Sequence, residues 1–303
     1  MRDRRRFRIG TPRLRLWQAG AVLVLCLSLA ACAPSSGGLH LNWTYFFDSI
    51  FHPDDQIRFG LWLTVSIAIT AQLTGIILGT FAALGKMAKH RIFRWIANVY
   101  IWLFRGTPLV VQIVLFYFGL GATRIYLWPD INILGVRVDG AIQAGLFALG
   151  INEGAYFAEI VRAGIIAIDP GQAEAGKALG MPYGKIMRRI VLPQAARVII
   201  PPLGNEFNNM LKTTSLLVLI SVPELFTIFD RKQGNFFAPF EFYLACAVWF
   251  LLLTTIWSVI QSWIERKFAK GTGTGVAGPS FRERLFGGSR NPADDVVVVS
   301  GGR

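Results

Sequence analysis

The sequence predicts an all-α integral membrane protein, and three observations support this: the apolar composition, several long uncharged segments and the placement of the basic residues. Of the 303 residues, 53% are apolar and only 16% are charged, which is more apolar side chain than a soluble fold of this length buries. Aromatic residues make up 13% of the chain and include nine tryptophans. Such rings collect at membrane interfaces, so we expect the chain to cross a bilayer several times.

Six segments approach the length of a membrane-spanning helix. About 20 apolar residues cross a hydrocarbon layer of about 30 Å as a helix, and a helix satisfies all of its own backbone groups there. The predicted spans are residues 17–33, 59–84, 106–121 with a lead-in from residue 96, 141–161, 198–222 and 242–264.

The second span carries a ladder of small residues, because Ala71, Gly75, Gly79 and Ala83 recur at every fourth position. Small residues let another helix approach closely in lipid. We expect this contact to lie within the subunit, with an interface between subunits as the alternative.

The lysines and arginines predict which connections lie inside the cell, because short cytoplasmic connections retain basic residues. If the N-terminus is inside, 24 of the 31 basic residues fall in the inner segments, which are 1–16, 86–95, 162–197 and 265–303. Only five fall in the outer segments, which are 34–58, 122–140 and 223–241. We therefore expect a multi-pass protein of the cytoplasmic (inner) membrane with both termini in the cytoplasm.

The first span leaves two outcomes open. It is short for a crossing, and the residues from Leu29 to Cys32 resemble a bacterial lipoprotein cleavage site behind a basic segment. The segment is either a retained helix, which we expect, or is cleaved and lipidated at Cys32. Both outcomes place residue 58 outside.

Several classes of function are disfavoured. The net charge of +13 comes from short basic runs between apolar segments, which does not indicate nucleic-acid binding. The three cysteines lie far apart or in apolar sequence and the three histidines are isolated, so neither a disulfide framework nor a metal site is predicted. The chain has no GxxxxGK[ST] phosphate-binding loop and no motif of a membrane enzyme. We therefore expect a protein without catalytic residues.

The polar segment 170–193 between the fourth and fifth spans predicts two short helices. Asp169 is the expected N-cap of the first, with Pro170 in its first turn and Gly180 at its end. Pro182 is expected to start the second and Pro193 to end it. In the second helix an apolar stripe of Ile186 and Ile190 runs beside the basic residues Lys185, Arg188 and Arg189. Such a face predicts a protein partner or a membrane surface.

This segment resembles the EAA loop of the permease subunits of ATP-binding cassette (ABC) importers. The matching residues include the spacing of the motif and are Glu174, Ala175, Gly176, Gly180, Ile190, Leu192 and Pro193. Gly176 departs from the alanine usual in the family, a change between two small residues. The resemblance implies that this loop, with Arg188 and Arg189, couples the permease to a separate cytoplasmic ATPase.

The resemblance covers residues 57–268 and is nearest to the permeases for polar amino acids such as His, Arg, Lys, Gln, Glu and opines. Three stretches carry it: Arg105 to Gln112, Gly150 to Gly164 and Gly204 to Leu216. It implies the helical bundle of type I importers, with a five-helix core beside the N-terminal hydrophobic helix. It also implies three partners: a cytoplasmic ATPase pair that uses ATP and Mg²⁺, an external amino-acid-binding protein and a second permease subunit. The chain itself is expected to bind no cofactor.

Polar and ionisable residues inside the predicted spans are candidates for the substrate pathway, since they are costly in lipid unless they are paired or line a water-filled path. A zwitterionic substrate needs an anionic partner for its ammonium group and donors for its carboxylate. Glu159 and Arg162, three residues apart, are also placed to form a pair. Helix caps, snorkelling charges and interhelical hydrogen bonds are the structural alternatives for each residue. The candidates are Arg105, Thr107, Asn152, Glu153, Tyr156, Glu159, Arg162, Asn208, Lys212, Thr214 and Ser215.

The expected organisation has three parts. Residues 1–56 hold the basic N-terminus, the first helix and an external segment, residues 57–268 form the transport domain, and residues 269–303 form a disordered cytoplasmic tail. The expected function is translocation of polar amino acids by alternating access, driven by the partner ATPase. A secondary transporter or channel that works without ATP is the alternative. The particular amino acid, and whether the permease pair is homo- or heteromeric, stay open.

Overall fold

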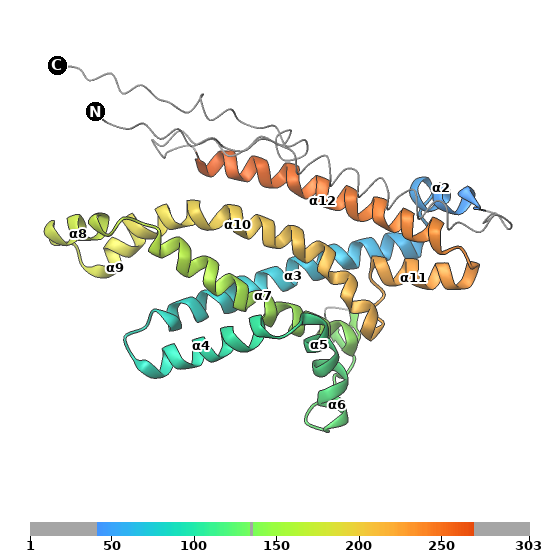
Figure 1. The fold of residues 1–303 in the computed structure, drawn as a ribbon, viewed down its shortest axis with the longest axis horizontal. Helices are drawn as coiled ribbons and strands as arrows, with labels where there is room; N and C mark the ends of the chain where they lie inside the picture. Colours follow the sequence, from blue (N-terminus) through green and yellow to red (C-terminus); the bar gives the residue numbers. More distant parts are fainter. Residues whose placement is uncertain (1–40, 134–135, 270–303) are drawn as a thin grey trace, which may run out of the picture. The chain divides into compact units, whose positions relative to one another are not determined.

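The computed structural model describes residues 41–133 and 136–269, so the predicted first span and the predicted tail beyond residue 269 lie outside the described residues. The described residues from Asn42 to Ala269 form one compact unit, drawn in Figure 1. Its helices are α2 (Trp43–Phe51), α3 (Asp55–Lys86), α4 (Arg91–Gly106), α5 (Leu109–Val114), α6 (Leu120–Ala122), α7 (Gly140–Ile166), α8 (Pro170–Ala178), α9 (Tyr183–Ile186), α10 (Leu192–Thr213), α11 (Leu225–Phe236) and α12 (Pro239–Ala269). Two π-helical turns, η1 (Leu115–Gly119) and η2 (Met187–Val191), one 3₁₀ segment, η3 (Thr214–Ile220), and two short strands, β1 (Ile131–Ile133) and β2 (Val136–Val138), complete the order.

The predicted all-α membrane fold is confirmed. Helices α3 and α12 are each long and apolar enough to cross a membrane, and two bent helix pairs reach the same length and composition when each pair is taken together. One pair is α4 with α5–α6, and the other joins the helical run 183–220 to α11. Helix α7 covers the predicted span 141–161, and 15 of its 27 residues are buried.

The small-residue ladder of α3 packs against α7, as expected for a contact within the subunit. All four residues of the ladder are buried. A Cβ atom added to Gly79 would lie 2.7 Å from the carbonyl oxygen of Gly154, and one added to Gly75 would lie 2.5 Å from Cγ of Glu153. The two helices therefore pack with their backbones close together, which only glycine permits at these positions.

The third predicted span is separated from its lead-in by a break. Helix α4 ends at Gly106, Thr107 adopts an extended backbone, and Pro108 caps α5. The two helices meet at 104°, because a proline cannot continue the hydrogen-bond ladder of α4.

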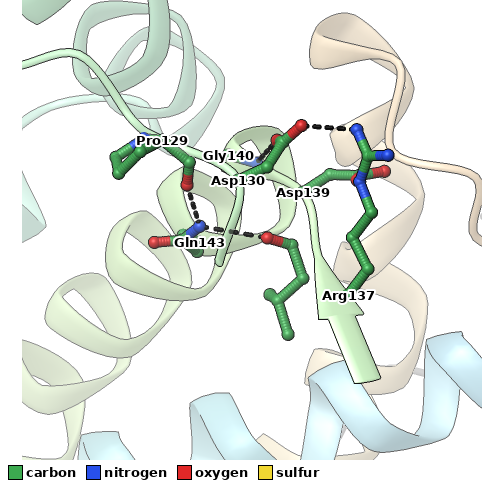
Figure 2. A network of polar contacts seen from close by, with 7 residues as sticks. Pro129, Asp130, Arg137, Asp139, Gly140 and Gln143 are labelled. Atoms are coloured by element: carbon green, nitrogen blue, oxygen red, sulfur yellow. Dashed lines mark hydrogen bonds and ion pairs between the residues drawn. The ribbon is translucent and has the colours of Figure 1, made fainter. Parts of the chain in front are cut away.

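A short antiparallel hairpin, β1–β2, precedes α7 and was not predicted. Its register pairs Ile131 with Val138 and Asn132 with Arg137. Figure 2 shows how side chains join it to the start of α7. The carboxylate of Asp130 accepts hydrogen bonds from the guanidinium of Arg137 at 2.6 Å and from the backbone N–H of Gly140 at 2.9 Å. The amide of Gln143 donates to the carbonyl oxygens of Pro129 and Val138.

Helices α8 and α9 lie at one end of the bundle, and α2 and α11 lie at the opposite end (Figure 1). We call these the loop end and the distal end. Helix α11 lies in the predicted outer connection 223–241, for which hydropathy alone predicts a loop. Glu224 explains its position: the buried carboxylate accepts hydrogen bonds from the N–H groups of Phe226 and Thr227 and from the hydroxyl of Thr227. The hydroxyl of Thr64 in α3 accepts from the N–H of Leu225, so α11 is fixed to α3.

Candidate coupling loop and transport pathway

The first helix of the loop 170–193 forms as the sequence predicts. Asp169 caps α8 by accepting a hydrogen bond from the N–H of Gly171 at 2.8 Å, and Pro170 lies in the first turn. Gly180 follows the helix with a φ of +70°, a backbone conformation that glycine adopts without strain. Pro182 then caps α9.

The prediction that Pro193 ends the second helix is wrong. The chain stays helical from α9 through the π turn η2 into α10, and Pro193 lies in the first turn of α10. In a regular α-helix the proline ring would clash with a carbonyl of the preceding turn. In η2 the N–H of Leu192 bonds the carbonyl of Met187, five residues back, and this wider turn relieves the clash.

The apolar stripe of the second helix finds its partner inside the loop. Ile186 is buried and Ile190 is half-buried. A Cβ atom added to Gly176 of α8 would lie 3.0 Å from Cγ1 of Ile186 and 3.3 Å from Cδ1 of Ile190. The glycine that departs from the family pattern is therefore the contact point of the two short helices. The loop is a packed knuckle, and its outward residues are free to contact another protein.

The outward surface of the knuckle combines charge with exposed apolar side chains. Glu174 and Ala175 are exposed on α8. Leu179 is 81% exposed and Tyr183 is 71% exposed at the turn between the helices. Lys185, Arg188 and Arg189 line a hollow with Gly184. Leu192 is exposed, at the start of α10.

Asn152 of α7 contacts the break between α4 and α5. Its side-chain amide donates to the oxygen Oε1 of Gln112 at 3.0 Å and to the carbonyl of Phe104 at 3.1 Å. The amide of Gln112 in turn lies 2.8 Å from the hydroxyl of Thr107, 2.9 Å from the carbonyl of Phe104 and 3.1 Å from the carbonyl of Thr107. Asn152 and Gln112 thus satisfy the carbonyl groups that the break leaves without helical partners.

Two further candidates meet at the same break. The guanidinium of Arg105 lies over the ring of Tyr156, 5.1 Å from its centroid, which is cation–π geometry. This pair joins the last turn of α4 to α7.

Glu159 forms an ion triad rather than a single pair. One carboxylate oxygen accepts from Nε of Arg162 at 2.9 Å, which is the pair the spacing predicts. The other oxygen accepts from the ammonium group of Lys86, at the end of α3. Glu159 therefore joins α3 to α7 near the loop end, seven residues before α7 ends at Ile166.

Glu153 is the centre of a buried polar cluster between α3, α7 and α10. It is 5% exposed, and Gln72 of α3 and Glu206 of α10 are its electrostatic neighbours. Among the described residues, Oε1 of Glu153, both amide atoms of Gln72 and Oδ1 of Asn208 are buried without a hydrogen-bond partner. Unsatisfied buried polar atoms are rare in native folds and call for an explanation.

The remaining candidates lie at the distal end of α10. Lys212 is exposed. The hydroxyl groups of Thr214 and Ser215 donate to carbonyl groups of Leu211 and Lys212 in their own helical run. Their contacts are therefore local.

Five polar residues of these sites were not among the predicted site residues: Gln72, Lys86, Gln112, Glu206 and Glu224. Gln72, Gln112 and Glu206 each stand inside a predicted span, which is a usable signal. Lys86 and Glu224 stand at span ends, where a polar residue is ordinary, so their partners become evident only in three dimensions.

These features are typical of a membrane-embedded transport subunit with a compact loop whose outward side chains are exposed. Residues 75–270 match the family model described as the binding-protein-dependent transport system inner membrane component, and the chain belongs to this family. It is the permease component of an ABC importer, it is not the catalytic subunit, and it carries no cofactor. The ATPase and the binding protein are separate components of such systems.

Similar proteins and structures agree with this. The chain is 37% identical over 268 residues to the arginine transport system permease protein ArgU of Corynebacterium glutamicum, covering 84% of this chain and 81% of that protein. It is 36% identical to the L-cystine transport system permease protein TcyB of Bacillus subtilis, with coverage of 69% and 84%. A crystal structure of an amino acid ABC transporter with histidines matches with a TM-score of 0.64 and 37% identity, over 73% of this chain and 98% of that one. The inward-facing MetNI methionine ABC transporter shares the fold at 17% identity, with a TM-score of 0.57 over 71% and 96%.

Proposed function

We propose that this permease passes polar amino acids, with cationic ones preferred, along a route beside Glu153. The observation that carries the proposal is the carboxylate of Glu153, buried between three helices beside Glu206 and Gln72, with one oxygen that has no hydrogen-bond partner. A substrate ammonium or guanidinium group would give this oxygen a charged donor. The named cargoes of similar permeases, arginine and L-cystine, support the same class.

Uptake of labelled arginine tests this proposal in liposomes that contain the permease, its ATPase and its binding protein. Glu153→Gln removes the negative charge and keeps the side-chain size, and an ionic hydrogen bond is worth about 1.5–3 kcal/mol, so arginine uptake is expected to fall about tenfold or more. Glu241→Gln is the matched control, since Glu241 is equally buried but accepts from the N–H of Asn42 at the distal end. Wild-type uptake and cargo preference in Glu153→Gln would refute the route.

The coupling loop is proposed to dock on the ATPase through α8 and the turn that follows. The exposed Leu179 and Tyr183 support this, since large apolar side chains at a loop tip favour a partner surface. Glu174, Ala175 and the basic residues Arg188 and Arg189 surround them. Leu179→Asp is expected to abolish co-purification of the ATPase, whereas Leu127→Asp, at a leucine that is 72% exposed elsewhere, is not. Retention of the ATPase by Leu179→Asp would show that the docking surface lies elsewhere.

The assembly and orientation are proposed as well. Two permease subunits stand over two ATPase subunits, residues 57–268 form the transport domain, and the loop end and both termini face the cytoplasm. The excess of basic residues in the predicted inner segments supports this orientation. Labelling of Tyr183→Cys by a membrane-impermeant maleimide tests it: reaction is expected in inverted vesicles and not in intact cells. Reaction in intact cells would reverse the orientation.

ATP-driven uptake also separates this function from a carrier or channel that works without ATP. The family assignment favours the importer, and the loop has no role in an uncoupled carrier. Uptake that persists when the ATPase is omitted would support the alternative.

A further inference from the structure

The distal end of the molecule carries a group of exposed aromatic rings that the transport route does not use. Six of these rings come from α2, from the end of α11 and from the start of α12. We call them the aromatic apex, and they are Trp43, Phe47, Phe51, Phe236, Phe237 and Phe240.

Helix α2 is built with two faces. Tyr45 and Phe46 face the protein and pack on the cluster that contains Phe229 and Phe242. Trp43, Phe47 and Phe51 face outward, and Phe51 is 69% exposed. The helix therefore has apolar side chains on both sides, which a helix facing water on one side does not.

Specific contacts hold α2 against α12. The N–H of Asn42 donates to Glu241 at 2.7 Å, and the indole N–H of Trp249 donates to the carbonyl of Ser49 at 3.0 Å. Trp43 meets Phe240 edge to face at 6.2 Å. The outward rings are therefore displayed from a fixed position.

Phe237 adds an independent observation. It follows α11 with a φ of +51° and is 91% exposed. A bulky residue in the left-handed region is strained, and glycine or asparagine caps a helix there at lower cost. Neither the strained backbone nor the exposed ring of Phe237 adds packing within the protein, so we expect the ring to contact lipid or a partner protein.

The surface that continues from the apex identifies the partner. Along α3 the exposed aromatic residues continue with Phe59 and Trp62. Along α12 the exposed apolar surface continues with Tyr243 and then with Leu251 and Leu252. Within residues 41–269, as far as the structure describes them, these two helices are the ones long and apolar enough to cross the bilayer alone. The apex is thus the distal border of the surface that faces lipid, at the depth where aromatic rings are enriched.

We propose that the aromatic apex is a lipid-interface anchor, in which α2 lies along the bilayer surface and its outward rings, with those of the α11–α12 turn, insert among the headgroups of the leaflet opposite the coupling loop. Amphipathic helices rich in Trp and Phe bind interfaces in this way. The anchor sets the depth of the outer ends of α3 and α12. It depends on the membrane location of the protein and not on the cargo.

Spin labels on the full-length protein in lipid nanodiscs test the proposal. The labels are attached at Phe237→Cys and, as a matched exposed position two residues earlier, at Asn235→Cys, in a background in which Cys26, Cys32 and Cys246 are replaced by alanine. Collision with oxygen, which concentrates in lipid, is compared with collision with a water-soluble nickel chelate. The ratio of oxygen to nickel collisions is expected to be several-fold higher at position 237 than at position 235.

A spin label at Phe51→Cys on α2 gives a second measurement if the substitution at position 237 prevents insertion of the protein into the membrane. The ratio of oxygen to nickel collisions is expected to be equally high at position 51. Equal ratios at positions 51, 237 and 235 would overturn the anchor. A label at 237 that contacts water until the binding protein is added would overturn it as well, and would identify the apex as a docking surface for that protein.

Discussion

Replacing Gln112 by leucine tests how the bent segment between α4 and α5 is held. The leucine keeps most of the volume and removes the amide, which supplies two hydrogens to the carbonyl and hydroxyl groups around the break and accepts one hydrogen bond from Asn152. Hydrogen bonds between membrane helices average about 0.6 kcal/mol and reach about 1.7 kcal/mol. Three of them give an expected loss of about 2 kcal/mol in the free energy of unfolding, or about 30-fold in the folded-to-unfolded ratio.

The assay is unfolding by sodium dodecyl sulfate in mixed micelles, followed by far-UV circular dichroism. Gln194→Leu is the matched control, since the amide of Gln194 donates only to the carbonyl of Ile190 in its own helical run, in the part of the chain that the structure describes. It is expected to cost well under half as much. A double-mutant cycle of Gln112→Leu with Asn152→Leu isolates their shared bond and should give a coupling of about 0.6 kcal/mol or more. Equal losses in Gln112→Leu and Gln194→Leu, with no coupling to Asn152, would refute the reasoning.

Three further outcomes are expected. Gly176→Leu should separate the two loop helices, because even a Cβ atom there lies 3.0 Å from Ile186. ATPase co-purification should then fall while membrane insertion is retained, and normal co-purification would contradict the packing of the two helices. Glu224→Ala should lower the free energy of unfolding by about 2–3 kcal/mol in the same assay, since it removes the carboxylate that accepts hydrogen bonds from two backbone N–H groups. A loss below about 0.5 kcal/mol, which is typical of a surface substitution, would contradict the role of Glu224 in fixing α11. The pKa of Asp130 is lowered from 3.8 by the N–H of Gly140 and by the guanidinium of Arg137, so this contact stabilises the hairpin above pH 3.8 and is lost as the pH falls through the lower, folded pKa. The protection factor of the Gly140 amide, which compares its exchange rate with that of an unstructured peptide at the same pH, should fall there, and an Asp130→Asn variant with the same pH profile would contradict this.

The spans and the loop could be predicted because each depends on short-range patterns. Apolar length gives α3 and α12, and the caps at Asp169 and Gly180 give α8. The prediction that Pro193 ends the second loop helix was wrong, because the π turn that accommodates this proline depends on hydrogen bonds that no residue pattern predicts. Helix α11 was missed for a related reason: its anchor is a contact between Glu224 and residues near position 64, far apart in sequence.

The candidate pathway shows the same limit. Spacing of three residues predicted the pair of Glu159 with Arg162, yet Lys86 joins them from another helix. Asn152 was predicted as a pathway residue, and the structure shows that it bonds Gln112 in α5, which follows a break whose angle the sequence does not give. Several residues predicted for substrate contact, such as Asn152 and Glu159, are thus engaged with other parts of the protein, whereas Glu153 has a buried carboxylate oxygen without a hydrogen-bond partner among the described residues.

The unbroken helical run from Tyr183 to Thr213 has a mechanical consequence. At about 1.5 Å per residue, such a run is roughly 45 Å long and starts inside the knuckle. It includes Pro193 in the first turn of α10 and Pro201 and Pro202 in its interior, and each proline removes one helical N–H donor, so bending of the run is concentrated at those positions. A displacement of the knuckle therefore reaches the region of Lys212 through these points of flexure and not through a rigid helix.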